Sequence, residues 1–182
     1  MAALCGEIAD GIILTRSTLA TATRIRSHLA EGARRVGRQP GEVTVVSLLP
    51  TAVGETRQQA VDALRPGLAF YAGFFPRYNR LIAEHGFAAE AAAIAAAWAR
   101  GDRNAAERAV SDALIDATSI AGTPQHCRER VEAYRQSGID LPIVSPFARG
   151  PGARGSSKRQ SAPAHLDTTK GTLIGSLAVR AF

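Results

Sequence analysis

Two short apolar runs, each followed by a helical pattern, constrain the fold of this chain more than any other feature. The first run is Ile12-Ile13-Leu14, which follows a glycine turn and carries no polar residue. Uninterrupted runs of this kind are typical of parallel strands, because a parallel strand is buried on both faces. An apolar stripe at helical spacing comes next: Ala22, Ile25, Leu29 and Val36. We therefore expect a buried strand and then a helix, with Ser17 as the helix N-cap.

The same unit is repeated after Gly41. Residues 42–49 are rich in β-branched side chains and are followed by Pro50, which predicts a second strand that ends there. A helix is expected over residues 55–70, and Pro66 should kink it or end it early.

Residues 71–121 differ, because helical patterns follow one another there and no strand is expected between them. An alanine-rich helix covers 88–99. The segment also gathers aromatic residues that we interpret as packing groups: Tyr71, Phe74, Phe75, Tyr78 and Phe87. We expect a helical insertion after the second strand.

A third unit follows. Thr123 as N-cap and Pro124 at the first helical position begin a helix, and residues 141–147 predict a short third strand. Beyond it the apolar period is lost. We expect two regions, a folded α/β domain over 1–149 and a disordered basic tail over 150–182.

Composition excludes several classes of function. Most of the net charge of +6 belongs to the last 35 residues, 148–182, which have six basic residues against Asp167 alone: Arg149, Arg154, Lys158, Arg159, Lys170 and Arg180. Without interleaved aromatic residues this tail is not expected to bind nucleic acid. Cys5 and Cys127 lie far apart and lack metal-ligand spacing, which indicates free thiols in the cytoplasm and no metal site. No segment is apolar over the length that a membrane span needs.

No motif for phosphate-loop, zinc-protease or serine-hydrolase chemistry occurs, and no pair of carboxylates stands out for acid/base work. The four histidines are scattered, and we expect surface or capping roles for them: His28, His85, His126 and His165. No catalytic residue is assigned.

The end of the first strand is the best candidate for a binding site. Thr15 follows the strand directly and Ser17 precedes the helix. In barrels of alternating strands and helices, ligands bind at the carboxyl ends of the strands, where helix N-termini favour phosphate. From the residues alone, phosphate binding by Thr15 and Ser17 and simple capping of the helix remain equally open.

Five landmarks, in this order, resemble the luciferase-like monooxygenases. They are Gly6–Leu14 (GEIADGIIL), Gly37–Val43 (GRQPGEV), Ala121–Pro124 (AGTP), Cys127–Arg130 (CRER) and Gly138–Pro142 (GIDLP). The ordered succession is more specific than any single landmark. It is similar to the C-terminal half of the family's barrel, around its sixth to eighth strands.

The resemblance implies a fold, a cofactor and a partial enzyme. The fold would be part of a TIM (β/α)8 barrel, with three parallel strands, and the cofactor FMN or coenzyme F420. In F420-dependent relatives the threonine that closes the sixth strand contacts the cofactor phosphate, and Thr15 stands in that place, whereas Thr18 stands where some relatives have a lysine. The chain would then be a partial flavin- or F420-dependent oxidoreductase that is inactive alone, since the family's other cofactor and acid/base groups would precede Met1.

Two further expectations follow. Three strands cannot close a barrel, so exposed strand edges predict self-association or a complementing barrel half. The alternative function is a non-catalytic helical module for protein interaction, with residues 55–137 as its body.

Overall fold

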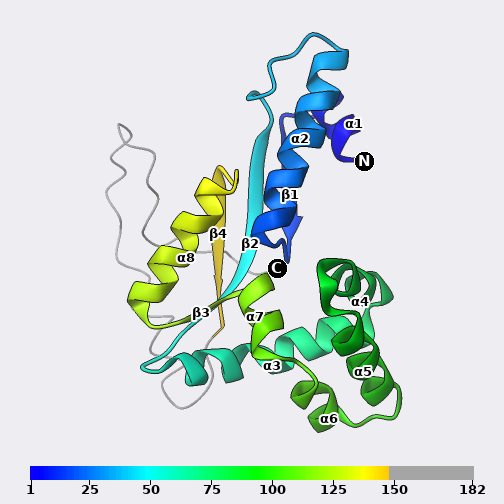
Figure 1. The fold of residues 1–182 in the computed structure, drawn as a ribbon, viewed down its shortest axis with the longest axis vertical. Coiled ribbons are helices and arrows are strands. Elements are labelled where there is room, and N and C mark those ends of the chain that lie inside the picture. Colours follow the sequence, from blue (N-terminus) through cyan, green and yellow to red (C-terminus); the bar gives the residue numbers. More distant parts are fainter. Residues whose placement is uncertain (148–182) are drawn as a thin grey trace, which may run out of the picture. The chain divides into compact units, whose positions relative to one another are not determined.

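The computed structural model describes residues 1–147 and confirms an α/β fold built on a parallel sheet (Figure 1). The predicted tail and the predicted boundary at residue 149 lie outside the described residues. In chain order the elements are α1 (Ala2–Ile8), β1 (Gly11–Thr15), α2 (Leu19–Arg35), β2 (Thr44–Val53), α3 (Arg57–Phe74), α4 (Pro76–Ile82), the π-helical turn η1 (Ala83–Phe87), α5 (Ala88–Ala99), α6 (Arg103–Arg108), α7 (Asp112–Thr118), β3 (Ile120–Gly122), α8 (Pro124–Gln136) and β4 (Leu141–Pro146).

Strand β2 is the centre of the sheet and pairs in parallel with the other three strands. Its residues 44–48 pair with β1, 46–51 with β4 and 51–53 with β3. Residues 46–48 therefore face β1 across one edge and β4 across the other, and Thr51 likewise separates β3 from β4. It follows that β1 and β3 lie one after the other along the same edge of β2, with β4 on the opposite edge.

The strand β3 corrects the expectation of three strands and of a purely helical segment over 71–121. It is only three residues long, Ile-Ala-Gly, and all three are buried. A strand this short gives no period to detect, and it directly follows α7, so the sequence pattern reads as a continuation of helix.

Two prolines were expected to end elements and do not. Strand β2 continues four residues beyond its predicted end at Leu49, and α3 runs through Pro66 to Phe74. In β2 the backbone groups of even-numbered residues point to the β1 and β3 edge, as the bonds from the Thr44 and Gly54 amides to Asp10 and Gly122 show. Pro50 therefore places its missing N–H in the gap between β1 and β3, where no ladder bond is lost.

In α3 the helix continues because its apolar stripe continues. Buried residues lie on both sides of Pro66: Ala60, Val61, Leu64, Leu68, Ala69 and Ala72. Their burial outweighs one lost backbone hydrogen bond, which agrees with the rule that tertiary packing provides most helical stability.

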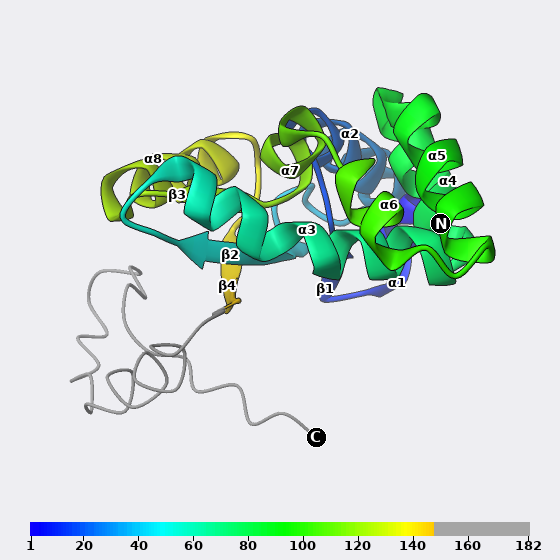
Figure 2. The same ribbon diagram turned by 90° about the horizontal axis from the view of Figure 1, so that it is seen from below.

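The described residues form two hydrophobic cores. One lies between the sheet and helices α2 and α8, and its fully buried members include Leu29, Val45, Leu49 and Tyr134. The other joins α3 to α5, α6 and α7 around residues such as Ile94 and Leu114. Figure 2 shows α4, α5 and α6 gathered beside α3, away from α8. The expected helical insertion is thus confirmed, and it has its own core.

The aromatic residues of the insertion pack on one another, as expected. Phe70 is within ring-contact distance of Tyr71, Phe74, Phe75 and Trp98. Part of the group remains exposed, with Phe74 58% accessible. Among residues 1–147 no helix has both the length and the apolar composition to cross a bilayer.

Candidate anion-binding site at the end of β1

The loop after β1 joins a strand end to a helix N-terminus in three residues. Thr15 is the last residue of β1 and is exposed, and Thr18 is the N-cap of α2. Among residues 1–147 the Thr15 hydroxyl has no hydrogen-bond partner, so it does not cap the helix. The hydroxyl is free to bind a ligand.

Ser17 does not cap the helix either, which corrects that expectation. The Thr18 hydroxyl accepts the bond from the Thr21 amide, at 3.1 Å. Ser17 is 2% exposed, and its Oγ lies 2.7 Å from the Oγ of Ser47 on β2. Its carbonyl accepts a 2.9 Å hydrogen bond from the Tyr134 hydroxyl. Ser17 therefore anchors the loop to the sheet and to α8.

Arg16, between these two residues, carries the charge of the site, and the sequence reasoning missed it. The residue is only 5% exposed, and its guanidinium lies 4.6 Å from the ring centroid of Tyr71. It makes no hydrogen bond and no ion pair within the described part of the chain. Burial lowers the pKa of Arg16, against the opposing influence of Tyr71 and Tyr78, but an arginine stays protonated at neutral pH. Among residues 1–147, Arg16 is thus a buried cation without an anionic partner.

The backbone at Arg16 is also strained. Its φ of +50° is the only positive value at a non-glycine residue among residues 1–147. The left-handed conformation costs an ordinary L-residue roughly 1–2 kcal/mol. Strained residues that surrounding structure holds in place are found mainly at functional sites. Arginine directly after an apolar strand, flanked by hydroxyl residues, was the signal that could have identified it.

His85 forms a further contact with the start of α2. It lies in η1, and its Nε2 is 3.1 Å from the hydroxyl of Thr21, which in turn lies 3.0 Å from that of Thr18. Its buried Nδ1 has no partner among the described residues. His85 was expected to be a surface or capping residue. It is half-buried, and it contacts Thr21, which lies next to the N-cap Thr18.

Stability should depend on pH through His85. Burial, and then the charge of Arg24, lower the pKa of His85 from 6.5, with Glu84 opposing. Below pH 6.5 the unfolded chain binds a proton that the folded chain resists, so folding stability falls as the pH drops from 6.5 through the lowered pKa. We expect the His85→Gln variant to lose part of this acid dependence in urea unfolding at pH 7.5 and 5.5. His28→Gln, on the exposed side of α2, should keep it, and an equal acid dependence of His85→Gln and the wild type would contradict the assignment.

Together these features suit an oxyanion such as phosphate. The N-terminus of a 17-residue helix, a free hydroxyl at Thr15 and the buried charge of Arg16 converge on one loop. Residues 1–147 hold no cluster of metal ligands. No acid/base pair accompanies the loop either, so its geometry supports binding and orientation.

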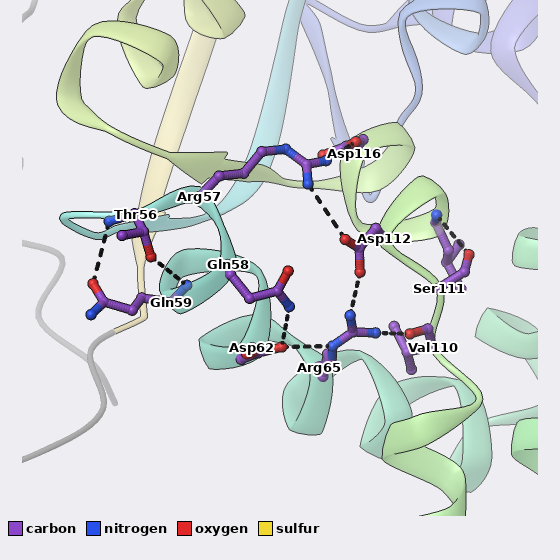
Figure 3. Close-up of polar contacts among 11 residues, drawn as sticks. Thr56, Arg57, Gln58, Gln59, Asp62, Arg65, Val110, Ser111, Asp112 and Asp116 are labelled. Atoms are coloured by element: carbon purple, nitrogen blue, oxygen red, sulfur yellow. Dashed lines mark hydrogen bonds and ion pairs between the residues drawn. The ribbon is translucent and has the colours of Figure 1, made fainter.

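A second polar cluster joins α3 to α7 (Figure 3). Arg65 binds Asp62, Asp112 and the carbonyl of Val110, and Arg57 binds Asp112 and Asp116. Every charge in this cluster has a partner of opposite sign. We therefore interpret it as a structural clamp on α7 and not as a ligand site.

The chain is similar to known proteins in sequence. The family model for luciferase-like monooxygenase matches residues 1–141. The chain is 31% identical over 153 residues to 5,10-methylenetetrahydromethanopterin reductase from Methanolobus tindarius, covering 83% of this chain and 46% of that protein. It is 29% identical over 140 residues to the enzyme of the same name from Methanopyrus kandleri, covering 76% and 40%. The chain thus spans less than half the length of the curated relatives it matches.

Solved structures show the same relation. The coenzyme F420-dependent tetrahydromethanopterin reductase from Methanopyrus kandleri superposes with a TM-score of 0.71 at 26% identity, over 86% of this chain and 44% of that one. An F420-dependent secondary alcohol dehydrogenase in complex with an F420-acetone adduct shares the fold, with a TM-score of 0.54 at 18% identity over 80% and 39%. The reductase, at 26% identity, supports F420 as a cofactor within the family. The family model, the relatives and the fold agree, and the chain belongs to the luciferase-like monooxygenase family.

Proposed function

We propose that this chain binds the phosphate of a deazaflavin or flavin, F420 before FMN, as part of an oxidoreductase. The observation that carries the proposal is Arg16, a buried cation that has no anionic partner among residues 1–147 and directly precedes the first turn of α2. A buried charge without a partner is unfavourable, and a bound phosphate would provide the missing counter-charge. F420 takes precedence over FMN because the solved reductase that superposes with a TM-score of 0.71 is described as F420-dependent.

Three consecutive residues of the loop have different roles in binding. Thr15 donates its hydroxyl to a phosphate oxygen, Arg16 supplies charge, and Ser17 holds the loop by its bonds to Ser47 and Tyr134. When bound, the cofactor supplies the hydride chemistry. The apolar side chains beside Thr15 on the exposed sheet face, Ile13 and Leu48, exclude water from that side.

Turnover is a separate question from binding. We propose that these residues bind the cofactor but do not complete a catalytic site, because His85 has no second acid/base group beside it at the loop among residues 1–147. A hydride-transfer site requires the cofactor and substrate to be held in one geometry. The test is an assay of F420 reduction or oxidation with methylenetetrahydromethanopterin, and substrate-dependent turnover by the 182-residue chain would contradict this part of the proposal.

Thr15→Val tests the site with an isosteric change. The loss of one hydroxyl that donates to a charged group should weaken F420 binding about 10-fold, since such bonds contribute about 1.5 kcal/mol or more. Titration of F420 fluorescence with the 182-residue chain measures it, with Thr23→Val on the exposed side of α2 as control. Equal affinity of Thr15→Val and the wild type would remove Thr15 from the site.

The open edges of the sheet bear on how the chain assembles. The outer edges of β1 and β4 pair with no strand among residues 1–147, and Ile13 on the open face is 66% exposed. We propose that a second copy or a complementing barrel half covers this surface in the cytoplasm. Sedimentation at increasing protein concentration tests self-association.

The alternative, a helical module for protein interaction, is favoured by one observation only. Phe70, Phe74 and Phe75 form an exposed aromatic surface on the insertion. A stoichiometric protein partner that is lost on Phe74→Ala, together with no cofactor binding, would support the module over the enzyme.

A further inference from the structure

Tyr134 of α8 occupies the point where β1 and β3 meet along the edge of β2. Strand β1 ends opposite Leu48, and β3 begins opposite Thr51. The two chain segments that flank this gap are the loop at Ser17 and the end of α7. The Tyr134 hydroxyl lies 2.9 Å from the carbonyl of Ser17 and 3.3 Å from that of Ala117.

This hydroxyl is built into the protein interior. Tyr134 is fully buried, and burial raises its pKa, although Arg130 opposes that change. The phenol therefore remains protonated and serves as a donor to both carbonyls. Pro50 has no N–H to offer at this gap, so β2 supplies no donor there. The tyrosine hydroxyl is the donor that joins the two segments on either side of the gap.

The loop next to it needs such a tether. Arg16 adopts a left-handed conformation, and its charge has no anionic partner among residues 1–147, so both its backbone and its side chain favour rearrangement. Two side-chain contacts hold the adjacent Ser17: its hydroxyl to Ser47 and its carbonyl to Tyr134. Loss of the Tyr134 hydroxyl would leave the Ser17 carbonyl without that partner and free the loop to relax.

We propose that Tyr134 is a positioning residue that holds Arg16 and the N-terminus of α2 in the geometry that binds an anion. The inference rests on the proposed function of the loop. The same hydroxyl connects the loop to α7, which Arg57 and Arg65 clamp to α3 through Asp112 and Asp116 (Figure 3). The insertion and the binding loop thus share one hydrogen-bonding group.

The test compares two variants that each lose one buried hydroxyl. Tyr134→Phe removes the tether, while Thr118→Val removes a buried hydroxyl that bonds only the Leu114 carbonyl within α7. We expect Tyr134→Phe to weaken F420 binding 5- to 20-fold and to speed amide hydrogen exchange at Arg16–Thr18. Thr118→Val should leave both unchanged, although both variants unfold at lower urea concentration than the wild type.

The outcomes separate the two proposals. If the wild-type chain binds F420 and both variants bind it equally well, Tyr134 does not position the loop and the inference is wrong. If Tyr134→Phe loses affinity only in proportion to its unfolded fraction, the role is structural and the inference is also wrong. If the wild type binds neither F420, FMN nor inorganic phosphate, the proposed function itself has failed, and this inference with it.

Discussion

Replacing Arg16 with methionine is expected to weaken F420 binding by roughly 10- to 150-fold. Hydrogen bonds to charged groups contribute about 1.5–3 kcal/mol, and each 1.4 kcal/mol is a factor of ten in affinity. Methionine keeps an unbranched apolar stem but removes the guanidinium, and with it both the charge and the contact with the Tyr71 ring. The loss should appear in fluorescence titrations at equal ionic strength.

The folding stability of Arg16→Met, unlike its affinity for F420, should stay the same or increase. Arg16 is buried, unpaired and strained, so its charge contributes little to folding beyond its contact with Tyr71. The urea midpoint of Arg16→Met is expected to equal or exceed that of the wild type. Such a separation of binding from stability is the mark of a residue retained for its ligand.

An exposed arginine provides the control. Arg108 on α6 has no hydrogen bond or ion pair within residues 1–147, so Arg108→Met changes the net charge equally without touching the loop. We expect wild-type affinity for it. Equal losses in the two variants would mean that overall charge, and not Arg16, attracts the cofactor.

Replacing Gly32 with alanine should lower the free energy of unfolding by about 2 kcal/mol. A Cβ at Gly32 would overlap the carbonyl of Ala3 in α1, and one at Gly6 would overlap the carbonyl of Leu29 in α2. The two helices therefore touch backbone to backbone. Overpacking costs typically 1–3 kcal/mol, and a Cβ that overlaps a backbone carbonyl belongs at the upper end of that range. Alanine's better helix propensity returns nearly 1 kcal/mol, which leaves a net loss of about 2 kcal/mol.

Urea unfolding measures this effect. Gly41→Ala is the matched control, since no atom lies within 4 Å of a Cβ there and its φ is not positive. That variant should stay within about 0.5 kcal/mol of the wild type. A more stable Gly32→Ala would show that α1 does not pack on α2 in solution.

The sequence was sufficient for those elements whose local pattern and burial agree. The strand at residues 12–14, the alanine-rich helix at 88–99 and the Thr123-Pro124 helix start were predicted from spacing and capping residues, and the structure confirms all three. The burial expected on both faces of that strand was wrong, because Ile13 is 66% exposed. Where a long-range contact decides, local pattern was insufficient. Pro50 is tolerated in β2 only because the neighbouring strand is interrupted at that place.

The site was predicted in position but not in detail. Thr15 lies where expected, at the carboxyl end of β1. Ser17 points inward because it bonds Ser47 and Tyr134, which are 30 and 117 residues away in the sequence. The importance of Arg16 depends on its burial and on the absence of a described partner. Neither can be inferred from a lone arginine between two hydroxyl residues.

Binding of the cofactor phosphate between the end of β1 and the N-terminus of α2 is tested most directly by a two-dimensional amide NMR titration of the 182-residue chain with F420. We expect the largest shifts at residues 15–21, and we expect inorganic phosphate to shift the same amides. Saturating F420 that leaves these amides unmoved, or that moves only residues elsewhere in the chain, would contradict this expectation.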